Sequence, residues 1–210
     1  MADGRPGERD ALHRAARWLN ARAPARAGRW PGLIMVTDPA RMPDPVACAR
    51  RLPRGSAIIY RAFGAADAAA LGRKLRAVAR ARGLVLLVGA DPALARAIGA
   101  DGVHLPERLA HRARRIRMAN PAWLVTAAAH SRAALRRAAG AGAQAVLLSP
   151  VFDSASPSAG PALGALRFAA LVRTCRTPVY ALGGVSGRTA ARLMSSGAVG
   201  VAAVDALSAG

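Results

Sequence analysis

The sequence has few aromatic residues and almost no lysine. Aromatic side chains make up 4% of the 210 residues, and Lys74 is the one lysine among 31 basic residues. The formal net charge of +20 would by itself suggest a nucleic-acid partner. However, no basic segment is interleaved with the aromatic rings on which single-stranded bases stack, and an excess of Arg, Ala and Gly is typical of GC-rich coding. We therefore expect no nucleic-acid binding.

Cysteines and long apolar runs are also scarce. Cys48 and Cys175 do not form a metal-binding spacing and indicate a reduced protein. No uncharged apolar run approaches the roughly 20 residues of a membrane-spanning helix. No charged segment followed by an apolar one indicates a signal peptide at Met1. We therefore expect a cytoplasmic protein without a membrane partner.

Short apolar segments, in contrast, are abundant and alternate with segments rich in Ala, Arg and Leu. Eight of them, each bounded by turn residues, are predicted strands, at residues 33–37, 57–61, 84–89, 102–105, 124–128, 145–149, 179–182 and 199–203. They are continuously apolar, as in a parallel sheet covered on both faces. Eight strand–helix units predict a compact (β/α)8 TIM barrel of the α/β class. The alternative, an open doubly wound sheet, would need a glycine-rich turn after the first strand, where residues 37–39 are Thr-Asp-Pro.

The segments between these strands have helical periodicity. They are residues 66–82, 92–98, 107–118, 131–140, 163–175 and 188–196. A further amphipathic helix is expected over residues 8–22, followed by a Pro/Gly/Arg linker at 24–32. We therefore divide the chain into an N-terminal helix and linker (residues 1–30) and the barrel (residues 31–210). The N-terminal helix is expected to cover an exposed flank or the bottom of the barrel.

The most informative segments lie around the last two predicted strands. Residues 178–185 are PVYALGGV and residues 197–204 are GAVGVAAV. A glycine pair after a buried strand lets backbone N–H groups approach a ligand that a Cβ atom would block. The loops after strands 7 and 8 of a TIM barrel commonly form a phosphate site. Gly183, Gly184 and Val204 are therefore predicted to bind phosphate.

Short motifs near the ends of five predicted strands together resemble a known family. The motifs are GADGVHL at 99–105, AHS at 129–131, SPVF at 149–152, ALGGV at 181–185 and GVAAV at 200–204. Their order and spacing, from about Leu33 to Leu207, are similar to those of the thiamine phosphate synthase/TenI superfamily. The resemblance implies a TIM barrel in thiamine biosynthesis whose ligand is a phosphorylated thiazole or a related compound.

The sequence departs from the synthase branch at the positions that serve its chemistry. The synthase joins a pyrimidine diphosphate to a thiazole phosphate and holds the diphosphate and Mg²⁺ with a Gln-x-Arg-x-Lys strand end. Residues 59–63 are IYRAF here, so only Arg61 remains. The Asn-Asp pair after strand 3 is replaced by Gly89-Ala90, and residues 106–109 (PERL) lack the second metal-binding aspartate.

These losses argue against a metal-dependent reaction by the usual route. Metal ions and lysines stabilise a leaving diphosphate by several kcal/mol. The remaining acidic residues, Asp38, Asp91 and Glu107, lie on different predicted loops without the spacing of a metal site. We therefore expect no metal and no cofactor, and Mg²⁺ would be required only if the chain were a synthase.

The remaining motifs resemble the TenI branch, whose members isomerise a thiazole carboxylate phosphate. His130 aligns with the catalytic histidine of that branch, and an imidazole can remove and return a proton near neutral pH. Arg61, at the end of the second predicted strand, is expected to face the phosphate pocket and to be a second catalytic residue beside His130. His130 would otherwise cap the following helix. His104, Ser154 and Ser156 are candidate ligand contacts, although His104 would equally serve as a structural residue and the serines would equally belong to a flexible loop.

Asp205 opposes the phosphate prediction. A carboxylate at the start of the last helix caps that helix and repels a phosphate dianion if it points into the pocket. The preferred function is a metal-independent thiazole tautomerase. Thiamine phosphate synthase and a non-catalytic barrel that binds a thiamine-related ligand or a protein partner remain alternatives. A homodimer also remains open.

Overall fold

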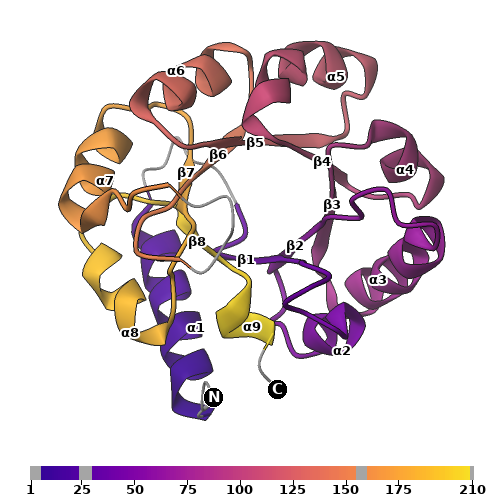
Figure 1. The fold of residues 1–210 in the computed structure, drawn as a ribbon, viewed down its shortest axis with the longest axis horizontal. Helices are drawn as coiled ribbons and strands as arrows, with labels where there is room; N and C mark the ends of the chain where they lie inside the picture. The colour runs from indigo at the N-terminus through magenta and orange to yellow at the C-terminus, as the bar shows by residue number, and fades with distance from the viewer. Residues whose placement is uncertain (1–5, 24–29, 155–159, 209–210) are drawn as a thin grey trace.

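A computed structural model describes residues 6–23, 30–154 and 160–208 of the chain. Eight parallel strands form a closed barrel in which each strand pairs with the next one and β8 pairs with β1 (Figure 1). The strands are β1 (Leu33–Val36), β2 (Ala57–Tyr60), β3 (Val85–Gly89), β4 (Gly102–Leu105), β5 (Leu124–Ala129), β6 (Ala145–Leu148), β7 (Val179–Ala181) and β8 (Gly200–Ala203). The TIM-barrel prediction is confirmed, and the predicted strands differ from these by at most one residue at either end.

Helices surround the barrel in the order expected from the sequence. Those at predicted positions are α3 (Ala68–Arg82), α4 (Pro92–Ala97), α6 (Arg132–Gly140) and α7 (Gly164–Arg173). The predicted helical segment 107–118 is helical but divided, because a 3-10 helix η2 (Glu107–Arg112) precedes α5 (Ala113–Ala119). The segment 188–196 likewise contains a short α8 (Gly187–Ala190) and a 3-10 helix η3 (Ala191–Leu193).

One helix that was not predicted, α2 (Pro45–Arg50), lies between β1 and β2. Its start is well defined, since Pro45 occupies the first turn and the Asp44 carboxylate accepts a hydrogen bond from the Ala47 N–H at 2.8 Å. The helix has only 6 residues, too few for a clear periodic pattern.

The N-terminal helix α1 (Pro6–Arg22) covers the flank of the barrel next to α8 and β8 (Figure 1). Its own Leu12 and Leu19 are buried, and the Asn20 amide donates to the carbonyls of Trp30 and Val199 at 2.9 and 3.0 Å. These contacts tie the helix to the start of the β8 strand. The last helix, α9 (Asp205–Ser208), is only one turn long and follows β8 directly.

The barrel interior is apolar along most of its length and becomes polar at one end. Side chains such as Ile59, Leu147 and Tyr180 belong to one buried cluster inside the barrel. At the carboxyl ends of the strands, buried or half-buried polar side chains such as His104 and Ser149 replace them. This polar end is where TIM barrels hold their ligands. None of the helices described here has the length and apolar character needed to cross a membrane.

Candidate active site at the carboxyl ends of the strands

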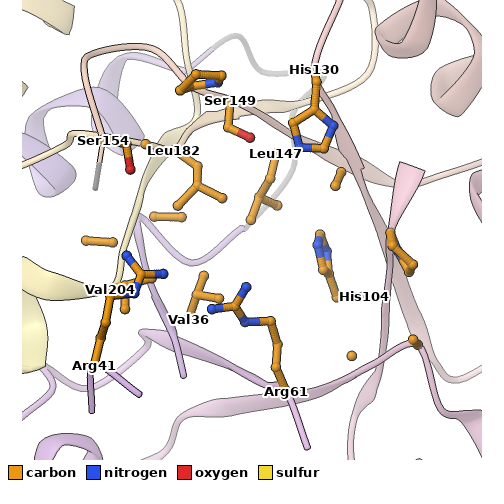
Figure 2. Close-up of a pocket in the computed structure, with 18 of the residues that line it drawn as sticks. Val36, Arg41, Arg61, His104, His130, Leu147, Ser149, Ser154, Leu182 and Val204 are labelled. Atoms are coloured by element: carbon orange, nitrogen blue, oxygen red, sulfur yellow. The ribbon is translucent and has the colours of Figure 1, made fainter. Parts of the chain in front are cut away.

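A cavity of about 690 Å³ opens at the polar end of the barrel. Figure 2 shows the side chains of Arg61, His104 and His130 directed into it from three different strand ends. Its wall also includes the main chain at Gly183 and Gly184 and the residues at the end of β8. Most of the residues singled out from the sequence therefore meet in one cavity, with a volume typical of small-molecule sites.

His130 follows β5 and is held by an acidic residue of η2, Glu107. Its Nδ1 atom lies 2.9 Å from Oε2 of Glu107, and the same oxygen accepts the His130 backbone N–H at 3.0 Å. The other oxygen, Oε1, accepts from Arg137 of α6 at 3.1 Å. The side chain of His130 is 49% exposed. The imidazole is thus fixed on one side and reachable from the cavity on the other.

His104, on the neighbouring strand β4, has a different environment. It is buried, and its Nδ1 lies 2.9 Å from the hydroxyl of Thr126. Burial, with smaller contributions from the charges of Arg61 and His130, lowers the pKa of His104 to about 3. His104 is therefore neutral near pH 7 and is suited to hydrogen bonding rather than to carrying a proton.

Four charged side chains form a chain along the ends of β1, β2 and β8. Arg61 donates from Nε to the Thr37 carbonyl at 2.7 Å and from Nη2 to Asp38 at 2.8 Å. Asp38 also pairs with Arg41 at 3.0 Å, and Arg41 in turn reaches Asp205 at 3.2 Å. Burial opposes ionisation of Asp38, but the hydrogen bond and charges of the two arginines outweigh it and lower its pKa.

The chain of charges includes Asp205, whose carboxylate was expected to repel a phosphate. Asp205 borders the cavity, but its carboxylate is 59% exposed and is paired with Arg41. The repulsion expected between Asp205 and a phosphate is therefore reduced by a neighbouring guanidinium. Arg41 itself was not predicted as a site residue.

The corner after β7 has the backbone geometry that its glycine pair suggested. Gly183 and Gly184 have φ of 87° and 64°, which favours glycine. A Cβ atom on Gly183 would lie 2.7 Å from the Cα of Pro150, and one on Gly184 would meet the carbonyl oxygen of Asp153. Among the described residues, no protein acceptor takes the backbone N–H groups of Gly183, Gly184 or Val204. Their phosphate-binding role stays a prediction.

The structure places only one of the two serines that were predicted as ligand contacts in the loop after β6. Ser154 borders the cavity (Figure 2). Ser156 lies outside the described residues, so its predicted role has no structural test. Ser149, at the end of β6, was not proposed as a contact, yet its hydroxyl also points into the cavity in Figure 2.

The acidic residues near the cavity are engaged in other contacts. Asp91 caps α4 by accepting the Leu94 N–H at 2.9 Å, Glu107 holds His130 and Arg137, and Asp38 lies between two arginines. In the part of the chain that the structure describes, no three His, Cys, Asp or Glu side chains are grouped as a metal site would require. The donor set therefore does not fit the Mg²⁺ that the synthase resemblance implies.

Sequence patterns alone also missed Phe63 at the cavity mouth. Its side chain is 70% exposed, its backbone has φ of 48°, and the Arg61 guanidinium lies 5.1 Å from the ring centre. A positive φ at a bulky residue is strained. The signal available in the sequence was its position two residues after Arg61, but nothing local indicated an exposed ring there.

Comparison with known proteins places the chain in a family. The sequence model of a family described as thiamine monophosphate synthase matches residues 33–207. The chain is 33% identical over 144 residues to a thiamine-phosphate synthase of Roseiflexus sp. (strain RS-1), covering 68% of this chain and 61% of that protein. It is 34% identical over 134 residues to a thiamine-phosphate synthase of Methanoculleus marisnigri, covering 63% and 64%. Each match thus spans less than two thirds of the relative's length.

Solved structures support the same fold. A thiamine phosphate pyrophosphorylase from Pyrococcus furiosus superposes with a TM-score of 0.74 at 23% identity, covering 87% of this chain and 90% of that one. FabK from Thermotoga maritima superposes with a TM-score of 0.63 at 19% identity, covering 83% and 58%. Because the family pattern runs from the first strand of the barrel into its last helix, this chain belongs to the thiamine monophosphate synthase/TenI family.

Proposed function

We propose that this protein acts in thiamine biosynthesis on a thiazole phosphate and that its chemistry is a metal-independent tautomerisation. The observation that carries the proposal is His130, held by Glu107 at 2.9 Å and facing the same cavity as the glycine corner. A tautomerase removes a proton from one atom of its substrate and returns a proton at another. A half-exposed imidazole with one nitrogen toward the ligand is able to do both.

The phosphate of the substrate would lie against main-chain donors. The N–H groups of Gly183, Gly184 and Val204 border the cavity without a protein acceptor among the described residues. Such donors bind a phosphate dianion without a metal ion. The guanidinium of Arg61, held by Thr37 and Asp38 at the end of β2, adds positive charge to the same cavity.

The division of roles between the two histidines supports the same chemistry. His104 has a pKa of about 3 and stays neutral, so it is able to orient the substrate by a hydrogen bond. His130 is the accessible histidine of the pair and would carry the proton. The two rings lie on adjacent strands and point into one cavity (Figure 2).

A second candidate function is thiamine phosphate synthesis, which the names of the sequence relatives favour. That reaction needs neutralisation of a leaving diphosphate. The acidic residues around this cavity are engaged with arginines, a histidine and a helix start, and they do not fit a magnesium site.

The two functions separate in one set of assays on the purified full chain. A tautomerase converts the thiazole carboxylate phosphate in the presence of EDTA, and His130→Asn lowers kcat by roughly 10²- to 10⁴-fold. The control is His111→Asn, since His111 is exposed on η2 and does not border the cavity. Formation of thiamine phosphate from the pyrimidine diphosphate and the thiazole phosphate, only with Mg²⁺, would replace the proposal by the synthase. Heat stabilisation by the ligand without either reaction would indicate a binding protein.

A further inference from the structure

We propose that Glu107 is the positioning residue of His130: it keeps the proton on Nδ1 and thereby presents the unprotonated Nε2 to the cavity. The inference rests on the proposed role of His130 as the proton carrier. Glu107 is thereby given a role other than the metal ligation for which its position after a predicted strand was first considered.

The first step is the direction of the hydrogen bond between the two side chains. The Nδ1 atom of His130 and Oε2 of Glu107 are 2.9 Å apart. An ionised carboxylate has no proton to donate, so the imidazole must donate from Nδ1. In the neutral ring the other nitrogen, Nε2, then carries the lone pair.

Glu107 is ionised in this setting. Burial raises the pKa of its carboxyl group, but the hydrogen bonds from the ring and the backbone of His130, together with the charges of His130 and Arg137, outweigh burial and bring the pKa below its ordinary value. The carboxylate thus remains an acceptor across the neutral range.

The second step is the rigidity of the arrangement. One oxygen of Glu107 accepts both the backbone N–H of His130 at 3.0 Å and the ring Nδ1, so the ring is fixed relative to its own main chain. The second oxygen is held by Arg137 of α6 at 3.1 Å. Three elements of the barrel, η2, the end of β5 and α6, therefore converge on one carboxylate.

His104 differs from His130 in the kind of group that its ring contacts. The partner of His104 is the hydroxyl of Thr126, which is able to donate or to accept a hydrogen bond. A hydroxyl partner does not select one tautomer, whereas a carboxylate does. Of the two cavity histidines, only His130 has a partner that fixes where its proton lies.

The test measures the tautomer of His130 without any ligand. Histidine side chains of the full-length protein are labelled with ¹⁵N, and the His130 signals are identified by their loss in His130→Asn. The wild type should show the Nδ1–H tautomer. Glu107→Ala, and Glu107→Met as a variant of similar volume, should shift the ring toward Nε2–H. Both variants should lower kcat roughly a hundredfold and leave KM within about twofold, as expected for a residue that acts through another.

Arg137→Ala provides the matched control. It removes the other partner of Glu107 but leaves the contact with His130, so the tautomer should stay Nδ1–H, and the loss of kcat should be smaller than in Glu107→Met because Arg137 is 65% exposed. An unchanged tautomer in a folded Glu107→Met variant would overturn the positioning role, whatever the activity. If the tautomer shifts but the wild type has no tautomerase activity, the role of Glu107 stands and the proposed function fails.

Discussion

The two ends of the cavity use different parts of the chain. At the β4–β5 end, ionisable side chains line the cavity, and each has a partner from another element: Glu107 for His130 and Thr126 for His104. At the β7–β8 end, the main chain of two glycines lines the cavity, in places where a Cβ atom would collide with neighbouring atoms. The first end holds ionisable rings in place, and the second end is the proposed binding site of the phosphate.

Different substitutions should therefore damage the two ends of the cavity. A main-chain site is destroyed by any added side chain, because the atoms that would collide belong to the backbone and cannot rotate away. A side-chain site tolerates changes of size but depends on partners, protonation and charge. The predictions below test this contrast, beginning with the largest expected effect.

At the β7–β8 end, Gly184→Ala should weaken the affinity for a thiazole phosphate by roughly tenfold to a hundredfold, as expected for 1–3 kcal/mol of backbone strain and collision. The new Cβ would meet the Asp153 carbonyl and lie 2.7 Å from the Cβ of Phe152. Isothermal titration calorimetry measures the affinity. Gly140→Ala is the matched control, since a Cβ on Gly140, at the end of α6, has nothing within 4 Å. Equal affinities of Gly184→Ala and wild type would place the phosphate elsewhere.

At the β4–β5 end, acidification should destabilise the fold through His104. Its pKa is about 3 in the folded protein against 6.5 ordinarily, so between these values the unfolded state binds a proton that the folded state does not. Stability therefore falls as pH falls, by about 1.4 kcal/mol per pH unit for this group.

The measurement compares urea unfolding of the wild type and His104→Gln at about pH 6.5 and about pH 4.5. His13, whose pKa burial also lowers, acts in the same direction in both proteins, so the difference in slope isolates His104. Identical slopes for His104→Gln and wild type would mean that His104 does not resist protonation in the fold.

The charge chain runs along the ends of β2, β1 and β8, and Arg41→Ala should weaken phosphate affinity about fivefold. Without Arg41, the carboxylates of Asp205 and Asp38 lose one guanidinium partner each, and a contribution of about 1 kcal/mol is expected for a partly exposed pair at low salt. The double variant Arg41→Ala/Asp205→Asn should recover most of the affinity. If it recovers none, the carboxylate of Asp205 does not oppose phosphate binding.

The smallest expected effect is at the cavity mouth. Phe63→Gly should raise the melting temperature by a few degrees, because it relieves a positive φ of 48° at an exposed ring, worth about 1 kcal/mol. Ligand affinity should fall by about twofold to fivefold if the ring contacts the ligand beside Arg61. Leu166→Gly, at another highly exposed position but within α7, should instead lower the melting temperature. A loss of stability in Phe63→Gly would show that the ring is structural.

The fold was largely predictable, and the contacts of the site were not. Continuous apolar segments gave the strands to within one residue, because burial on both faces leaves a pattern that depends on no distant residue. The helix α2 was missed because 6 residues carry too little periodicity. Glu107 was visible as an acidic residue after a strand, but its nearest functional partner is 23 residues away, and Arg41 meets a residue 164 positions away.

The sequence by itself determined the barrel, the end of the barrel at which the candidate site lies, and the glycine corner. Strand burial and the conformational freedom of glycine are local properties. Only the tertiary structure decided which charges neutralise one another and which histidine stays neutral. Those outcomes depend on distances and burial across strands, and the same residue types in another arrangement would ionise differently.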